Sequence, residues 1–257
     1  MLLGPILHVG PVNAAATVVS HRAFYEMELG SVAQNANIQA ISGRSAFTLM
    51  DECDGWRSSE DYVIEFGGNE GSLDRIVSQF RSWESDDGDK YSFEIDEKST
   101  FKGNQSFNGF AVTNADDGEA YFSMASDVAV ELPKETYFPM QHLHKIISHA
   151  ASGKKILSAS VFTGAEPDEA LMSTNTVIGS WNEDRAAGLL GAFSQDGFWP
   201  VQVAYFKPKA QVAEPEYEIN YSMQANGVVR RYEIDYGGFT VVARLVTIEP
   251  VEKPVCK

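Results

Sequence analysis

Apolar and polar residues alternate with a period of two along much of this chain. Within 23–29 the odd positions are apolar or aromatic, whereas Glu26 and Glu28 stand at even positions. The same alternation runs through 61–66 and 91–96. Because successive side chains of a strand point to opposite faces of a sheet, each segment predicts a half-buried β-strand.

Turn sequences separate these segments at the spacing of antiparallel hairpins. Four residue pairs allow positive φ at low cost: Asp87-Gly88, Asp117-Gly118, Asn226-Gly227 and Gly237-Gly238. The alternation is clearest late in the chain, where it predicts three consecutive strands over 217–224, 228–236 and 239–249. The pattern as a whole predicts a meander of antiparallel strands.

One segment has helical spacing instead. Its apolar residues follow Pro139 at steps of three or four, namely Met140, Leu143, Ile146, Ile147 and Ala150. Pro139 suits the first turn of a helix, and Gly153 suits the position just past its end. Lys154 and Lys155 then lie near the negative pole of the helix. We expect this helix to be covered by the sheet on its apolar face, and a weaker helical pattern spans 183–190.

Composition narrows the class of protein. The 257 residues are 44% hydrophobic and contain no apolar tract long enough to span a membrane, which predicts a soluble globular protein. Twenty basic and 36 acidic side chains give a net charge of −16, which repels nucleic acid and anionic lipid surfaces. No repeat or composition shift marks a boundary, so a mainly β, single domain is predicted over 17–257.

The first 16 residues have a different character. They carry no charged side chain, include an apolar run, and end in three alanines that match a signal-peptidase site. Pro5, Gly10 and Pro11 interrupt the apolar run, and no basic residue precedes Arg22. The segment 1–16 is therefore interpreted either as the tail of a secretory signal or as a disordered leader.

Three histidines in the helical segment, His142, His144 and His149, invite a metal site. Their spacing argues against one, because ligands on one helix face stand four residues apart. The acidic turns around Gly88 and Gly118 lack the order of a calcium loop and are interpreted as hairpin turns. No nucleotide-binding, nucleophile-elbow or zinc-protease motif occurs, so no catalytic residue, metal or cofactor is predicted.

Aromatic residues lie along the predicted strands. Four tryptophans, Trp56, Trp83, Trp181 and Trp199, accompany fifteen phenylalanines and ten tyrosines. These rings either fill a core or line an apolar cavity between the sheet and the helix, as in carriers of hydrophobic ligands. Core filling is the usual role of any single ring, and the sequence does not distinguish a filled interior from a hollow one.

Two cysteines, Cys53 and Cys256, are the only ones in the chain. Neither belongs to a metal-ligand motif, so they are either two reduced thiols or one disulfide. A bridge between them would tie the end of the chain to its first quarter.

Several segments together resemble the cell-envelope integrity protein B (EipB) family of exported alphaproteobacterial proteins. The resemblance runs from His21 to Cys256 and rests on HRAFYEMEL (21–29), GRSAFTLMDECDGW (43–56), TYFPMQHLHKIISHAASGKK (136–155), FWPVQVAYF (198–206), YEINYSMQANGVVRRYEIDYGGF (217–239) and the closing cysteine. It implies a β-spiral or open barrel of antiparallel strands around one α-helix, similar in shape to periplasmic lipoprotein carriers. It also implies a Cys53–Cys256 disulfide and a periplasmic location.

The resemblance implies a non-enzymatic role in envelope integrity under stress and a link to a periplasmic tetratricopeptide-repeat partner. The leading hypothesis is a periplasmic factor that binds a lipid or other apolar ligand within the curved sheet. The first alternative is a protein-binding scaffold with a filled core that acts with the repeat protein. The second is a hydrolase of envelope polymers, for which abundant carboxylates are the only support.

Overall fold

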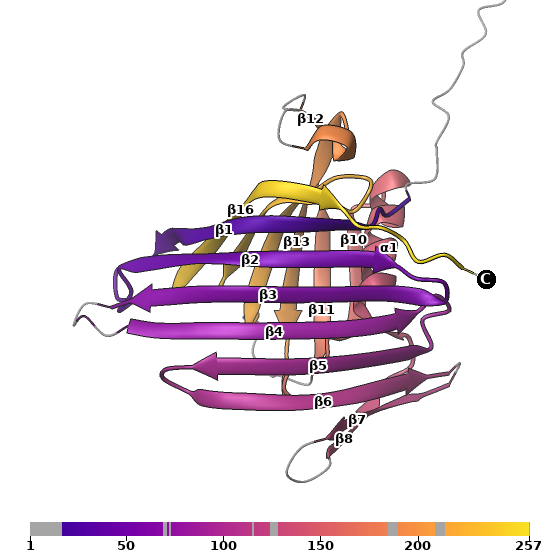
Figure 1. Cartoon of the computed structure of the whole chain (residues 1–257), viewed down its shortest axis with the longest axis horizontal. Helices are drawn as coiled ribbons and strands as arrows, with labels where there is room; N and C mark the ends of the chain where they lie inside the picture. The colour runs from indigo at the N-terminus through magenta and orange to yellow at the C-terminus, as the bar shows by residue number, and fades with distance from the viewer. Residues whose placement is uncertain are drawn as a thin grey trace, which may run out of the picture.

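One large sheet forms the body of the molecule (Figure 1). The structure is a computed structural model that describes residues 17–68, 71, 73–114, 116–123, 128–184, 190–208 and 214–256. The leader 1–16 and most of the weak helical pattern at 183–190 lie outside these residues. Glu183 itself belongs to a short strand, so the predicted helix does not begin there.

Within the described residues the sheet has 16 strands, and all but one of their pairings are antiparallel. The first eight strands are β1 (His21–Val32), β2 (Ala40–Asp51), β3 (Gly55–Gly67), β4 (Leu73–Ser85), β5 (Lys90–Ser99), β6 (Gly103–Thr113), β7 (Gly118–Ser123) and β8 (Val128–Leu132). The other eight are β9 (Thr136–Tyr137), β10 (Ile156–Phe162), β11 (Leu171–Ile178), β12 (Asn182–Glu183), β13 (Gly197–Phe206), β14 (Tyr217–Met223), β15 (Val229–Asp235) and β16 (Phe239–Pro250). One helix, α1 (Pro139–Ala151), and a short 3-10 turn, Gly191–Phe193, complete the described elements.

The strand order makes this sheet a spiral. Strands β1 to β8 follow one another as neighbours, and β16 returns to pair with β1 at the other side of the meander. The order then descends through β15, β14, β13, β11 and β10 to β9. Because β8 and β9 are joined by 133–135 alone, the two outer edges of the sheet approach each other. The predicted mainly β fold wound about one helix is confirmed.

The predicted strands and turns agree with the structure in most places. The three late strands are β14, β15 and β16, and Gly88, Gly227 and Gly237 each adopt positive φ in their turns. The Asp117-Gly118 prediction is wrong in register. The turn spans 114–117, where the Asn114 side chain accepts hydrogen bonds from the backbone of Asp116 and Asp117, and Gly118 is already the first residue of β7.

Helix α1 begins and ends where the sequence predicts. Gly153 has a φ of 75°, its N–H donates to Ala150, and the Lys154 N–H donates to His149. This pair of bonds is a Schellman ending, which requires the left-handed backbone that glycine adopts most cheaply. The apolar face of α1 packs on β10, β11 and β13 and reaches Leu49 of β2.

The beginning of α1 is held by a strand rather than by its own N-cap residue. Phe138 occupies the N-cap and offers no side-chain acceptor. The carboxylate of Glu84, in β4, instead accepts the N–H groups of Met140 at 2.7 Å and Gln141 at 2.8 Å. Burial raises the pKa of Glu84 to about 7 although both hydrogen bonds lower it. Glu84, only 2% exposed, therefore fixes where the helix enters the spiral.

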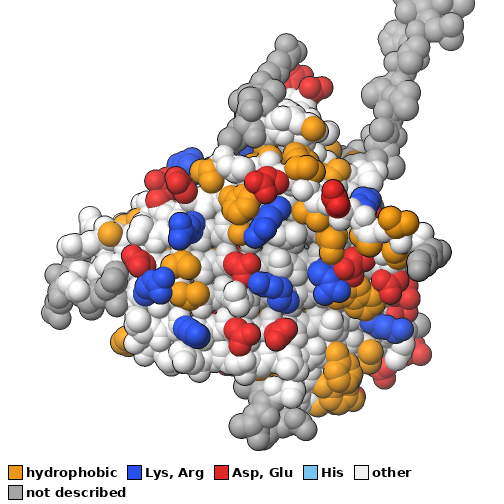
Figure 2. All heavy atoms as spheres, viewed as in Figure 1, with side chains coloured by type: hydrophobic (Ala, Val, Ile, Leu, Met, Phe, Trp, Pro, Cys, Tyr) orange, Lys and Arg blue, Asp and Glu red, His pale blue; other side chains and the backbone are white. Residues whose placement is uncertain are grey.

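The outer face of the first strands is polar. Figure 2 shows basic and acidic side chains interspersed over this face. Ion pairs join neighbouring strands there, such as Arg81 with Asp61 at 2.6 Å and Arg75 with Glu65 at 3.2 Å. Within the described part of the chain, no helix has the length and apolar character needed to cross a bilayer.

Candidate functional site

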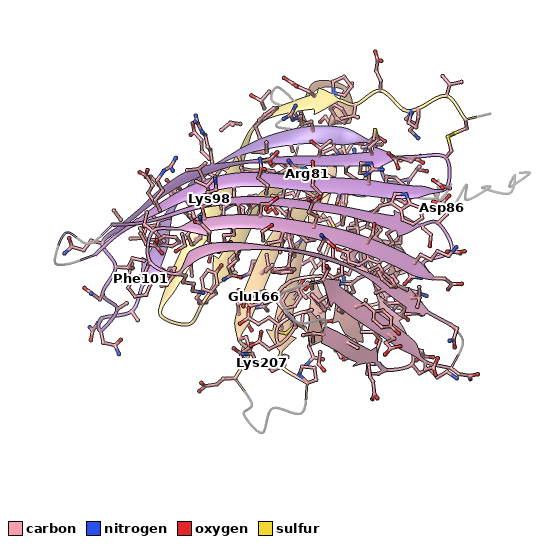
Figure 3. All side chains as sticks on the ribbon, turned by 60° about the horizontal axis from the view of Figure 1, so that its bottom comes forward. Arg81, Asp86, Lys98, Phe101, Glu166 and Lys207 are labelled. Carbon is pink, nitrogen blue, oxygen red and sulfur yellow. A yellow bond between two sulfur atoms is a disulfide. The ribbon has the colours of Figure 1, made fainter. Side chains whose placement is uncertain are left out.

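A cavity of about 480 Å³ lies inside the spiral. Figure 3 shows the two curved layers of strands between which the interior lies, with Arg81 and Lys98 labelled on the first layer. Both layers line the cavity, with β1 to β4 on one side and β13 to β16 on the other, and α1 contributes Pro139, His142, Leu143 and Ile146. Its volume lies in the range of about 300–1,000 Å³ that is common for small-molecule sites.

The cavity has a helix end and an end opposite the helix. Trp56, at the start of β3, lies against His144 of α1, with ring centroids 5.9 Å apart. Phe66, near the end of β3, is distant from α1 along the strand and contacts Phe239. Tyr236 lines the cavity near this second end and is 47% exposed. Tyr236 is thus an exposed residue of the cavity lining at the end opposite α1.

Glu60 is the acidic residue of this cavity. It stands in β3 between Phe47 of β2 and Phe80 of β4 in the cross-strand register, about midway between Trp56 and Phe66. Burial, with a smaller effect of Asp61, raises the pKa of Glu60 from 4.5 to about 7. Among the described residues, no lysine, arginine or other acid lines the cavity. The Glu60 carboxyl thus faces an apolar space without a protein counter-ion.

Tyrosines surround this carboxyl. Burial raises the pKa of several phenols, and the charge of Glu60 adds to the rise in Tyr25, Tyr62, Tyr221, Tyr232 and Tyr236. Three of their hydroxyls are already engaged: Tyr25 donates to the Val229 carbonyl at 2.8 Å, Tyr62 to Glu97 at 3.1 Å, and Tyr232 pairs with Ser45 at 3.4 Å. Tyr25, Tyr62 and Tyr232 therefore present mainly ring surface to the cavity.

Two histidines line the cavity toward its helix end. Nδ1 of His21 lies 2.8 Å from the Val19 carbonyl. His142 is 5% exposed and its Nε2 has no hydrogen-bond partner in the described structure. Burial lowers the pKa of His21 and brings that of His142 to about 4. Both rings are therefore neutral at pH 7, and the described residues that line the helix end of the cavity supply no positive charge.

The three helix histidines do not come together. His142 faces the cavity, His144 contacts Trp56, and Nδ1 of His149 lies 3.0 Å from the Lys145 carbonyl. Across the residues that the structure describes, no group of three or more His, Cys, Asp or Glu side chains is arranged to hold a metal. In the β4–β5 turn, the Asp87 carboxylate accepts the Asp89 N–H, which is the bonding of a hairpin turn.

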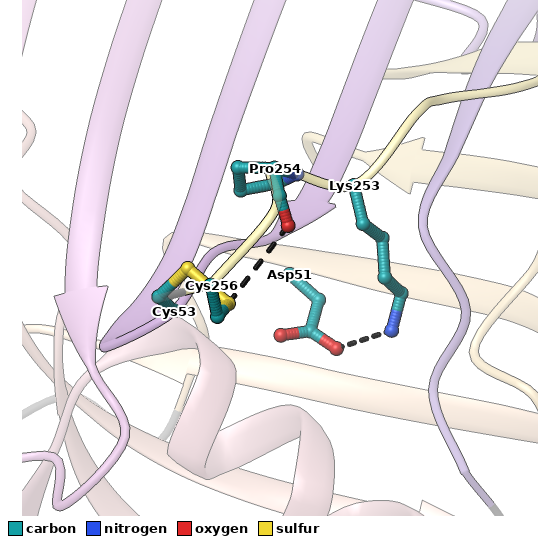
Figure 4. The surroundings of a disulfide bond; sticks show 5 residues. All are labelled: Asp51, Cys53, Lys253, Pro254 and Cys256. Atoms are coloured by element: carbon teal, nitrogen blue, oxygen red, sulfur yellow. Dashed lines mark hydrogen bonds and ion pairs between the residues drawn. A yellow bond between two sulfur atoms is a disulfide. The ribbon is translucent and has the colours of Figure 1, made fainter.

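The two cysteines form a disulfide (Figure 4). Cys53 follows β2, Cys256 lies in the segment after β16, and their Cα atoms are 5.4 Å apart. Lys253 donates to the Asp51 carboxylate at 2.5 Å beside the bridge. The pairing implied by the family resemblance is present, and it fastens the end of the chain to the loop between β2 and β3.

Glu60 is not among the residues singled out from the sequence, although the sequence carries a signal for it. Every second residue of β3 points inward, namely Tyr62, Ile64 and Phe66. Glu60 stands two residues before Tyr62 and lies on the same face. An acid on the apolar face of a predicted strand indicates a functional or capping group. Glu84 of β4 shows the same signal. It stands at an even position of the strand, on the same face as the apolar residues Ile76 and Phe80.

The raised pKa of Glu60 makes stability depend on pH. The folded protein holds the proton more tightly than the unfolded chain between pH 4.5 and about 7. The free energy of unfolding therefore falls as pH rises through this window, by up to about 3 kcal/mol at about 1.4 kcal/mol per pH unit. We expect Glu60→Gln to remove this contribution, so that the variant gains stability relative to wild type from pH 4.5 to pH 8.

Urea unfolding of wild type and Glu60→Gln at several pH values measures the difference in their free energies of unfolding. The contributions of the other titrating groups are common to both proteins and cancel in this difference. Glu65→Gln is the matched control, because Glu65 stands on the outer face of the same strand beside Arg75. Parallel pH profiles for wild type and Glu60→Gln would contradict the prediction.

The fold and the cavity define a hollow, barrel-like β protein. A solved structure with the same architecture is the crystal structure of a beta-barrel-like protein of domain of unknown function DUF1849 from Brucella abortus. It superposes with a TM-score of 0.84 at 25% identity, over 92% of this chain and 99% of that one.

The sequence comparison is more specific. The EipB-like family matches residues 12–252, and the chain belongs to this family. It is 27% identical to the cell envelope integrity protein EipB of Brucella abortus (strain 2308), over 93% of this chain and 88% of that protein. The family resemblance found in the sequence is confirmed.

Proposed function

We propose that this protein is a non-enzymatic factor of the periplasm that maintains the cell envelope by binding an apolar ligand inside the spiral. The cavity of about 480 Å³ carries this proposal, because aromatic and aliphatic side chains make up most of its lining. A cavity of this size and composition suits a hydrocarbon chain, which gains about 0.8 kcal/mol per buried CH₂ group.

The compartment and the role are supported by two observations. The Cys53–Cys256 disulfide is of a kind that persists in oxidising compartments such as the periplasm. The Brucella relative is named a cell envelope integrity protein, and the similarity covers nearly the whole chain. Both agree with the exported protein that the sequence predicts.

The alternatives fit the cavity less well. Most glycoside hydrolases place two carboxyl groups about 5–10 Å apart across the substrate, whereas Glu60 is the single acid of the cavity lining among the described residues. The scaffold hypothesis assumed a filled core, and the cavity inside the spiral argues against that part of it. A tetratricopeptide-repeat partner on the outside is compatible with a loaded cavity and stays a prediction from the resemblance.

Filling the cavity should weaken ligand binding. Leu143 of α1 lines the cavity, and Leu143→Trp places a larger ring there. If the ring denies the ligand about 60 Å² of apolar contact, affinity falls about tenfold at about 25 cal/mol per Å². Ser148→Trp on the exposed face of the same helix is the control and should bind as wild type does.

Fluorescence titration with phenylnaphthylamine, an apolar dye, measures this affinity. Native mass spectrometry of protein purified from a periplasm without detergent shows whether a ligand is retained. Absence of dye binding in the wild type, or equal binding in wild type and Leu143→Trp, would contradict the proposal.

A further inference from the structure

The unusual feature of the cavity is a single carboxyl group among aromatic rings. Glu60 is half-buried, and a carboxylate that is partly removed from water without a counter-ion is costly, so a bound cation would lower that cost. The nine ion pairs between described residues all involve other carboxylates. Glu60 is thus available to a charged group that comes from outside the protein.

The surroundings of Glu60 select among charged groups. An anionic headgroup finds no lysine or arginine in the described cavity lining, and both cavity histidines are neutral. A sugar needs many free donors and acceptors, yet the hydroxyls of Tyr25, Tyr62 and Tyr232 are bonded within the protein. Tyrosine ring faces carry negative charge density and attract ammonium groups. A carboxylate that shares its cavity with several such rings therefore fits a cation.

The rest of the cavity determines what the cation is attached to. From Glu60 toward α1 the lining is aliphatic and aromatic and includes Leu49, Leu143, Ile146 and Met223. Burying these surfaces favours a hydrocarbon chain over a small hydrophilic amine.

We propose that the cavity binds a ligand that joins an ammonium group to a hydrocarbon chain, with the ammonium beside Glu60 and the chain directed toward α1. This inference rests on the proposed function, which requires only an apolar ligand. It adds the charge of the headgroup and the residue that recognises it.

Three probes with the same chain test the headgroup: decyltrimethylammonium, decyl sulfate and decanol, each below its micelle concentration. Isothermal titration calorimetry with the wild type should show the ammonium probe binding about tenfold more tightly than the other two, a difference of about 1.4 kcal/mol, because only the ammonium gains the ion pair and the cation–π contacts. Glu60→Gln keeps the shape and removes the charge. It should lower ammonium affinity about tenfold and leave decanol affinity unchanged.

Glu65→Gln, which removes the same charge from the outer face of β3, should not alter the order of the three probes. Circular dichroism and the decanol affinity show that Glu60→Gln is folded. If decanol binds as tightly as the ammonium probe, or if Glu60→Gln keeps the preference, the headgroup inference fails and the carrier function stands. If none of the probes binds the wild type, both fail.

A pH series gives an independent readout. Ammonium affinity in the wild type should fall as pH decreases from 8 to 6, because Glu60 takes up a proton, and it should stay flat in Glu60→Gln. The titratable groups that share the cavity with Glu60 are the tyrosines of its lining, neutral in this range, and the two histidines. Two further acids lie nearby: Glu97, which accepts a hydrogen bond from Tyr62, and Asp61, on the outer face of β3. An unchanged wild-type affinity over this range would overturn the assignment of Glu60.

Discussion

Cys53→Ser is expected to lower the thermal stability of the oxidised protein more than the loss of any one hydrogen bond or ion pair would. The bridge joins residues 203 positions apart, and the chain-entropy description gives it at most about 5 kcal/mol. The native contacts around it are few: the segment after β16 has no strand partner, and Lys253 with Asp51 is the ion pair beside the bridge. The disulfide therefore stabilises the protein mainly by lowering the conformational entropy of the unfolded chain.

Calorimetry with and without reductant measures this effect. The wild type should lose stability when reduced, whereas Cys53→Ser should melt at the same temperature in both conditions. Cys256→Ser should behave as Cys53→Ser does, and the double variant should add nothing further. Equal melting of oxidised wild type and Cys53→Ser would refute a stabilising role for the bridge.

Glu84→Ala is expected to lower the free energy of unfolding by about 3 kcal/mol, because it leaves two helix N–H groups without acceptors in a buried place. The groups are those of Met140 and Gln141, and the N-cap residue Phe138 has no side-chain acceptor to replace Glu84. The α1 end of the cavity should loosen at the same time.

Urea denaturation measures the stability loss, and amide hydrogen exchange of Met140 and Gln141 measures the loosening. Glu84→Gln retains a carbonyl acceptor and should lose less than Glu84→Ala. Glu94→Ala, on the exposed face of β5, is the control and should change stability by less than about 0.5 kcal/mol. A Glu84→Ala protein with wild-type stability and exchange rates would show that the helix does not depend on this cap.

Local patterns in the sequence predicted local structure well. The alternation at 217–224, 228–236 and 239–249 became β14, β15 and β16 within one or two residues, because each strand has one inward face. Pro139 and Gly153 marked the helix ends for equally local reasons. The Asp117-Gly118 prediction failed because the Asn114 side chain organises the turn earlier than the glycine.

Features that depend on distant residues could not be derived from these patterns. The pairing of β1 with β16 and the capping of α1 by Glu84 join segments far apart in the sequence. Whether Tyr62 and Tyr221 fill a core or line a cavity depends on the curvature of the whole sheet. The family resemblance supplied the spiral and the disulfide, and only the structure placed Glu60 among the tyrosines.

The pairing of β1 with β16 also governs how the protein folds. Strands β1 to β8 are sequential neighbours, which favours early contacts among them. One edge of β1 stays unpaired until β16 joins the sheet. Contacts between such distant segments slow folding, and an uncovered strand edge invites aggregation meanwhile. Cys256, six residues beyond β16, meets Cys53 once that last strand is in place. We therefore expect this pair to oxidise after β16 has joined the sheet, so that the disulfide would mark chains with a complete spiral.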